Sequence, residues 1–307
     1  MTQLRFAAVV FAALLLTACR DRSAGGRAGS DAKMPLRYHP PAGAVYHYTL
    51  VQRNVMTMET GPLAGMGKQE LAMRMHFTQR VKGPTAEGTG IEVQVTFDST
   101  SMEVPGVAPD VIAREVARLR GLKSTVVFDA RAQVVRTDFA AMPGIPPELA
   151  SQMAAGIKAM TFAFPEQPVG RGDSWTIATE LPMGQLPGGT GSGAGPARTT
   201  LTVRAIRVSG SAGGGGGGGG GDTTVILDVK TEFPTDPIQL NIGGQRATLK
   251  LGGTLAGDQQ FSLTRGAVLE ATMRGTMKMN VTAAALGQQA MVVSSDTENT
   301  LRLLDGK

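Results

Sequence analysis

Apolar and polar residues alternate at every second position along most of this chain. In residues 45–59, 70–82 and 90–103, one alternate set is mainly apolar and the other mainly polar. Because successive side chains of a β-strand point to opposite faces of a sheet, this period predicts strands with one buried and one solvent-facing side. Sheets of that kind are commonly antiparallel. The chain should therefore be built around antiparallel β-sheet.

The same alternation continues through the rest of the chain. Further strands are predicted at residues 124–128, 133–137, 174–181, 198–208, 223–233, 245–251, 259–264, 267–280 and 291–304. Residues 109–120 depart from the pattern because their apolar residues recur at helical spacing. A second helix is predicted at residues 147–160, with Pro147 at its start. The fold class is therefore mainly β, with two short inserted helices.

Short sequence echoes indicate two related halves. Gly43-Ala-Val-Tyr46 opens the first strand and Gly172-Asp-Ser-Trp175 opens a later one, while the hairpin at 127–135 resembles that at 261–269. Two copies of such a meander would build one long curved sheet, although chance similarity is the alternative. We predict an antiparallel curved sheet or half-open barrel made of two meander-like halves. The halves would be residues 36–163, with both helices, and residues 164–307, with Gly-rich loops.

Glycine is unusually frequent, at 41 of 307 residues, and it concentrates in residues 188–195 and 213–221. Gly-rich loops can bind phosphate where a strand leads into a helix N-terminus. The second run leads instead into residues 223–227, which have the sequence of a strand. Both runs are therefore interpreted as flexible loops of low complexity.

The N-terminus has the zones of an export signal. Arg5 supplies positive charge, and the apolar run at residues 6–16 is too short for a hydrocarbon core of ~30 Å. Leu16-Thr17-Ala18-Cys19 follows and resembles the lipobox of bacterial lipoproteins. The resemblance implies a signal peptide at residues 1–18 and a lipid on Cys19. An ordinary signal peptide followed by a chance cysteine is the alternative.

Residues 19–35 would join this anchor to the folded body. They are mostly small and polar, so they cannot bury enough surface to offset their ordering entropy, and a flexible tether is predicted. Two or three acyl chains on Cys19 would give stable anchoring. Arg20 stands where an Asp would retain a proteobacterial lipoprotein at the inner membrane. The resemblance therefore implies an outer-membrane location, on the periplasmic or surface face, with membrane lipid as the partner held through Cys19.

Charge and cysteine content exclude several classes of function. The formal net charge is +5, but Arg5 and residues 20–33 hold more than half of it. The body has no Lys/Arg stripe with interleaved aromatic residues, so nucleic-acid binding is not expected. Cys19 is the single cysteine, so no intramolecular disulfide can form.

The sequence also lacks the common catalytic motifs. Its three histidines, His39, His47 and His76, do not have the spacing of zinc ligands. Neither a G-x-S-x-G elbow nor a P-loop is present. We therefore predict no enzymatic activity, no metal and no cofactor. An envelope hydrolase is the alternative, and it would require His47 or His76 beside a carboxylate in a pocket.

Paired methionines at spacing of two are the remaining candidates for a site. Each pair places two thioethers on one sheet face, and soft sulfur suits Cu(I). The pairs also continue the apolar alternation, and methionine is a flexible core filler, which favours packing over copper. A third interpretation is that they line a concave face for a hydrophobic ligand. The candidate lining residues are Met56, Met58, Met73, Met75 and Phe77.

Two family resemblances cover about residues 36–305. The Gly-x-x-aromatic strand openings, the segment FPEQPVGRGDSW and the hairpins with Arg in the turn resemble an uncharacterised family of bacterial lipoproteins, known only as a domain of unknown function. The meander with inserted helices is similar to the half-open β-barrels of the LolA and LolB lipoprotein carriers, which implies a concave sheet able to hold acyl chains. We predict a non-catalytic envelope lipoprotein that binds or scaffolds an envelope protein or lipid. A carrier or sensor of acyl chains is the alternative.

Overall fold

The computed structural model describes the following residues: 33–61, 64–140, 154, 163–179, 189–192, 195–208, 222–242, 245–283 and 290–304. The predicted signal peptide, Cys19 and the tether up to residue 32 lie outside them. So do the Gly run at 213–221 and, apart from Ala154, the second helix. The sheet that the sequence predicts lies almost entirely within the described residues.

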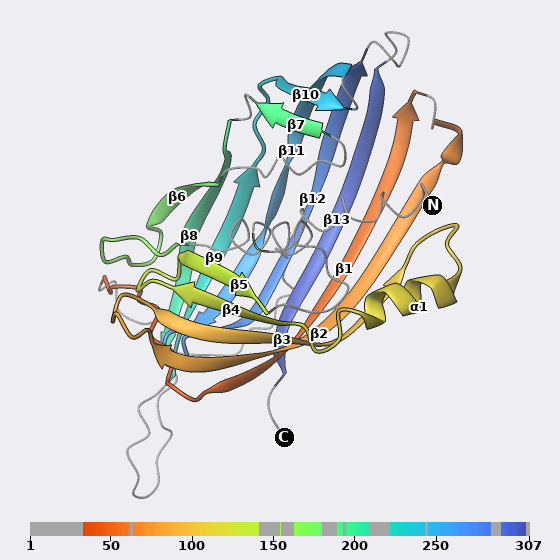
Figure 1. Cartoon of the computed structure of the whole chain (residues 1–307). Coiled ribbons are helices and arrows are strands. Elements are labelled where there is room, and N and C mark those ends of the chain that lie inside the picture. The colour runs from red at the N-terminus through yellow and green to blue at the C-terminus, as the bar shows by residue number, and fades with distance from the viewer. Residues whose placement is uncertain are drawn as a thin grey trace, which may run out of the picture.

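The described strands form one antiparallel sheet of thirteen strands (Figure 1). The strands are β1 (Val45–Thr60), β2 (Lys68–Pro84), β3 (Ile91–Glu103), β4 (Lys123–Phe128), β5 (Val134–Phe139), β6 (Ser174–Thr179), β7 (Gly189–Ser192), β8 (Ala197–Val208), β9 (Thr223–Glu232), β10 (Ile238–Ile242), β11 (Gln245–Ser262), β12 (Ala267–Ala283) and β13 (Met291–Leu304). A 3-10 turn, η2 (Ala64–Met66), joins β1 to β2.

The strand order confirms two meanders that meet in one curved sheet. The order is β5-β4-β3-β2-β1-β13-β12-β11-β9-β8-β6, with β10 paired to β11 and β7 paired to β10. The first meander runs from the centre of the sheet to one edge, and the second runs from the opposite edge back to the centre. There the first and last strands, β1 and β13, pair with each other. The predicted fold class is therefore confirmed: an open, curved antiparallel sheet.

Three predictions about the second half need correction. The strands predicted at residues 245–251 and 259–264 are parts of one continuous strand, β11, which ends at Ser262 and pairs with β12 along nearly its whole length. Residues 263–264 belong to the turn that follows. Gly253 and Gly257, which lie between the two predicted segments, allow close approach of the β12 backbone. The Gly-rich run at 188–195 contains β7, and β10 was missed, since both strands are short.

The one α-helix among the described residues, α1 (Pro109–Ala117), begins as predicted and ends three residues early. The backbone N–H groups of residues 118–120 bond three residues back rather than four, which tightens the chain into a turn. Gly121 follows with φ +79°, a conformation that ends a helix. The early end therefore has a local backbone cause.

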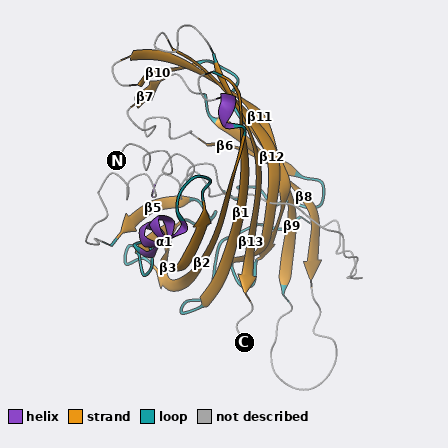
Figure 2. Ribbon diagram, turned by 90° about the vertical axis from the view of Figure 1, so that its right-hand side faces the viewer, coloured by secondary structure: helices purple, strands orange, loops and turns teal. Residues whose placement is uncertain are grey.

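The sheet curls so that its two ends share one apolar core (Figure 2). Val126 and Val134, from β4 and β5, belong to the same buried cluster as Leu201 and Val203 from β8. These strands lie at opposite ends of the strand order, so the face that carries the cluster is the concave, inner face of the sheet.

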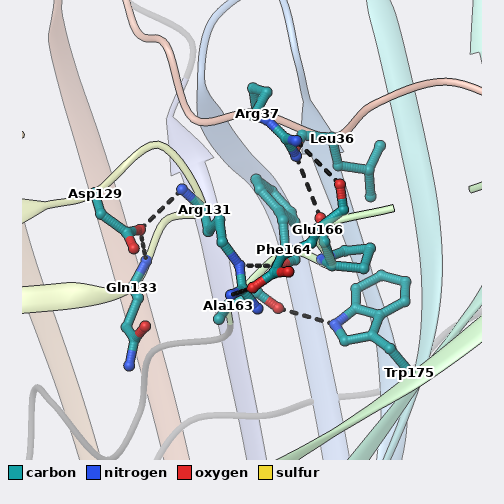
Figure 3. A network of polar contacts seen from close by, with 10 residues as sticks. Leu36, Arg37, Asp129, Arg131, Gln133, Ala163, Phe164, Glu166 and Trp175 are labelled. Carbon is teal, nitrogen blue, oxygen red and sulfur yellow. Dashed lines mark hydrogen bonds and ion pairs between the residues drawn. The ribbon is translucent and has the colours of Figure 1, made fainter. Parts of the chain in front are cut away.

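A segment between the two meanders fastens these ends together (Figure 3). This segment, the strap, comprises residues 163–169. The backbone N–H of Phe164 donates to the carbonyl of Arg131 at 2.7 Å, and the Arg131 Nε donates to the carbonyl of Phe164 at 2.7 Å. The Trp175 Nε1 donates to the carbonyl of Ala163 at 2.9 Å. The β4–β5 hairpin of the first meander is thereby joined to β6 of the second.

The segment FPEQPVGRGDSW therefore has a structural role. The ring of Phe164 is buried and contacts that of Phe261 edge to face, with centroids 5.0 Å apart. Arg37 adds hydrogen bonds to the carbonyls of Pro165 and Glu166. The strap holds the edge strands together without pairing them, so the sheet is curled but stays open.

The two meanders also open with the same backbone structure, as the sequence echoes predict. In each, the backbone N–H of a glycine with positive φ donates to the carbonyl of a valine. The N–H of the same valine donates to the carbonyl of the residue that follows the glycine. The residues are Gly43, Val81 and Ala44 in the first meander, and Gly172, Val203 and Asp173 in the second. The short sequence matches therefore reflect shared local structure.

Candidate functional site

The four central strands of the sheet are β2, β1, β13 and β12. Among the described residues, the inner face of these strands carries no charged residue. On β1, the inward residues are Tyr46, Tyr48, Leu50, Gln52, Asn54, Met56 and Met58. The outward face of the same strands holds ion pairs, such as Arg53 with Glu70 at 2.6 Å and Arg274 with Glu298 at 2.5 Å. The sequence alternation thus separates a charged outer face from an uncharged inner face.

Methionine is the main long apolar side chain on this inner face. The register of β1, β2, β3, β12 and β13 aligns Met56, Met58, Met73, Met75, Met102, Met273, Met277, Met279 and Met291 on it. All five predicted lining residues are therefore on one face. Met73 and Met75 are buried beside Leu50, whereas Met56 and Met58 are half-buried. Phe77 stacks on Tyr48, with ring centroids 5.2 Å apart.

A group of uncharged polar side chains interrupts the apolar lining at the centre of the face. Gln52 on β1 lies directly opposite Asn299 on β13, and each is 1 % exposed. None of the described residues hydrogen-bonds the two oxygens and two nitrogens of these carboxamides. A buried polar group left unpaired costs about 1–3 kcal/mol, so this pair destabilises the fold as it stands. Unpaired groups of this kind are uncommon in proteins and call for an explanation.

The next polar residues along the face are held by one another. The Ser295 hydroxyl donates to the Asn54 Oδ1 at 2.9 Å and lies 3.4 Å from the hydroxyl oxygen of Thr297. These polar residues are not among the predicted site residues. Their only signal in the sequence was that the apolar set of residues 45–59 is interrupted at Gln52 and Asn54.

Glycines form part of the inner face beside these polar residues. Gly275 lies between Thr297 on β13 and Leu255 on β11. Gly257 lies beside Met273 in the adjacent row of the same face. A Cβ added at either glycine would contact the backbone of the neighbouring strand. The central part of the face is therefore built from backbone, and this lets β11 and β12 approach closely.

The three tyrosines of the chain all lie in the apolar interior or at its edge. Burial is the main cause that raises the pKa of Tyr38, Tyr46 and Tyr48 above the ordinary value. The Tyr46 hydroxyl also donates to the carbonyl of Arg265 at 2.5 Å. A phenol in these surroundings is held in its neutral form.

We expect alkaline pH to ionise these tyrosines only as the protein unfolds. Because the folded pKa values are raised, the unfolded state releases the phenol protons more readily. Stability should be complete below about pH 10, the ordinary tyrosine pKa, and should fall as the pH rises above it. Tyrosinate absorbance should therefore rise together with loss of the far-ultraviolet circular dichroism of the sheet. A rise near pH 10 with the dichroism unchanged would contradict this placement of the tyrosines.

Of the histidines named for the hydrolase alternative, His47 lies next to a hydroxyl and a carboxylate on the outer face. The His47 Nδ1 lies 2.9 Å from the Thr78 hydroxyl oxygen, and that hydroxyl donates to Asp98 at 2.7 Å. His47 and Asp98 are exposed on the outer face. Among the described residues, no cluster of His, Cys, Asp and Glu could hold a metal ion.

Two shallow hollows lie elsewhere on the molecule. One, of about 360 Å³, is lined largely by outer-face residues such as Arg53 and Glu298, whose charges are already paired. The other, of about 290 Å³, lies between α1 and the end of β3. The unpaired carboxamides of Gln52 and Asn299 lie instead on the inner face, which is therefore the candidate site. None of the helices in the described ranges has the length and apolar character needed to span a membrane.

Comparison with known proteins gives only distant structural similarity. No family model and no curated protein matches the chain. A structure from a study of lipid–protein interactions in lipovitellin is similar with a TM-score of 0.42 and 8% identity, over 87% of this chain and 25% of that chain. This chain thus spans about a quarter of the lipovitellin chain. DynF from the dynemicin biosynthesis pathway of Micromonospora chersina is similar with a TM-score of 0.23 and 9% identity, over 94% of this chain and 93% of that chain. The resemblances to a lipoprotein family and to LolA and LolB stay predictions.

Proposed function

We propose that this chain is a membrane-anchored envelope lipoprotein that binds a hydrophobic ligand, such as an acyl chain, on the inner face of its sheet. The observation that carries the proposal is the uncharged, methionine-rich inner face, with unpaired polar groups at its centre. The proposed role is non-catalytic binding, because the residues on this face provide contact surface and hydrogen bonds rather than an acid, a base or a nucleophile.

The chemistry of the face favours a flexible apolar ligand. Thioether side chains are unbranched and polarisable, so they adapt to apolar partners of irregular shape. An ionic ligand group would lose its hydration here without meeting an opposite charge, which is costly. The half-buried Met56 and Met58 are followed along the face by Leu71 and then by the buried Met73 and Met75, so a chain-like ligand would meet apolar side chains beside the polar group.

The predicted anchor supports the same role. A lipid on Cys19 and a tether at residues 20–35 would keep the body close to a membrane, where acyl chains are abundant. The body itself presents charged residues outward and would remain hydrated on that side. The anchor and the ligand-binding face are thus separate parts of the chain.

Binding of a neutral fluorescent probe tests the proposal. The full chain with Cys19→Ser, which carries no covalent acyl group, is titrated with N-phenyl-1-naphthylamine. We expect saturable binding at a single class of site. Met56→Lys should weaken binding at least about tenfold, because it places an unpaired charge on the inner face.

A matched variant controls for the added lysine. Val55, the neighbour of Met56, lies outward, opposite Glu70 and Asp296, so Val55→Lys should leave binding unchanged. Absence of saturable binding to the Cys19→Ser chain, or equal loss of binding in Met56→Lys and Val55→Lys, would contradict the proposed function.

A further inference from the structure

We infer that Gln52 and Asn299 form a subsite for an uncharged group that both donates and accepts hydrogen bonds, such as an amide, on the bound ligand. This inference rests on the proposed function and adds the chemical class of the ligand. The ligand would be an amphiphile with an apolar chain and a neutral amide-like group.

The position of the two carboxamides supports this assignment. They face each other across β1 and β13, the strands at the centre of the sheet. Directly opposed residues of an antiparallel pair lie close enough for their side chains to act together. Each is 1 % exposed, yet the described residues provide no hydrogen bond to either carboxamide. The pair therefore has unused hydrogen-bonding capacity inside the apolar lining.

The chemistry of the pair determines which group fits. Each carboxamide has one oxygen acceptor and one NH₂ donor. A ligand amide also has one acceptor and one donor group, so the two side chains can satisfy it from both sides. A carboxylate or phosphate would bury a charge without a cation, since the charged residues of these strands are on the outer face.

The neighbours of the pair provide the rest of the subsite. Met73 on β2 flanks Gln52, and Met273 on β12 flanks Asn299. Leu50 and Leu301 form the next row on one side. The ligand chain can therefore follow apolar side chains while its polar group reaches the carboxamides.

On the other side of the pair, Asn54 and Ser295 bond to each other. Their hydrogen bond fixes both side chains and leaves Gln52 and Asn299 as the pair with unpaired groups. Because the carboxamides of Gln52 and Asn299 are unpaired while Asn54 and Ser295 bond to each other, we assign ligand recognition to Gln52 and Asn299.

Two ligands of equal size and shape test the inference. Decanamide and 2-undecanone differ only in whether the terminal group is NH₂ or CH₃, so the ketone accepts hydrogen bonds but cannot donate them. Each is used to displace N-phenyl-1-naphthylamine from the full chain with Cys19→Ser. The ratio of the ketone Kd to the amide Kd is compared between that chain and the same chain with Gln52→Leu and Asn299→Leu.

We expect the ratio to fall about tenfold in the double variant, because the hydrogen bonds that the amide NH₂ donates, and that the ketone cannot make, are lost. Gln94→Leu, the same change at an outward position on β3, should leave the ratio unchanged. The double variant should also melt at a higher temperature than its parent, because unpaired polar groups have been removed. This second readout separates loss of recognition from loss of folding.

The outcomes distinguish the two proposals. If both ligands bind and the ratio is the same in the parent chain and the double variant, the inference is wrong and the proposed function stands. If neither the probe nor either ligand binds the parent chain, the proposed function fails. A ratio that falls equally in Gln94→Leu would also overturn the inference, because the effect would not depend on the inner face.

Discussion

Replacing Phe164 with alanine is expected to lower the free energy of unfolding by about 3–5 kcal/mol. The side chain is 5 % exposed, and its ring contacts that of Phe261, on a strand of the second meander. The backbone of Phe164 is bonded to Arg131 of the first meander at both its N–H and its carbonyl. Loss of the ring would leave a cavity where the strap holds the two ends of the sheet together.

Urea denaturation of the full chain measures this change. Val135→Ala is the control, because Val135 is 63 % exposed and its truncation should cost less than about 0.5 kcal/mol. Phe164→Leu should recover part of the stability, since it refills much of the cavity. A loss below about 1 kcal/mol in Phe164→Ala would show that the strap does not hold the curled sheet.

Replacing Gly257 with alanine should also be strongly destabilising, by about 1–3 kcal/mol or more. The added Cβ would lie 2.8 Å from the Cα of Met273 and closer still to the carbonyl oxygen of Thr272. These are backbone atoms of β12, which cannot move aside as a flexible side chain would. The two strands would have to separate at the centre of the inner face.

Gly252→Ala in the same strand is the matched control. A Cβ at Gly252 meets nothing within 4 Å, so this change should be neutral or slightly stabilising. The measurement is the melting temperature of each variant by circular dichroism. Equal melting temperatures would contradict the close approach of β11 and β12.

The alternation of side chains was sufficient to predict most of the sheet. Residues 45–59 and 291–304 were predicted from their period alone and correspond to β1 and β13 with an error of one residue or less. Long half-buried strands are the easiest to recognise, because solvent on one face imposes a strict period of two. The pairing of these two strands could not be predicted, since it depends on contacts between the ends of the sequence.

Glycine caused the main errors in strand assignment. Gly252 and Gly253 lie within β11 but suggested a break, because glycine usually punctuates a strand. The role of Gly253 depends on the distance to the neighbouring backbone, which the sequence does not contain. The strap had no strand or helix period, so FPEQPVGRGDSW was visible as a motif but its contacts were not.

The candidate site was predicted only in its apolar part. The methionines of residues 45–59 and 70–82 follow the period, and their common face could be derived from it. Gln52 and Asn299 are far apart in sequence, and polar residues at apolar positions could equally have faced a loop. Their pairing required the register of β1 against β13.

Methionine-methyl NMR tests most directly the claim that a hydrophobic ligand occupies the inner face. The full chain with Cys19→Ser is labelled at its methionine methyl groups and titrated with decanamide. The resonances of Met73 and Met273, which flank the carboxamides, are assigned by single Met→Leu variants. Met34, whose backbone pairs with Val169 of the strap, is the internal reference. We expect saturable shifts of the Met73 and Met273 resonances, with that of Met34 unchanged. Saturable binding that left both the Met73 and the Met273 resonances unmoved would contradict this claim.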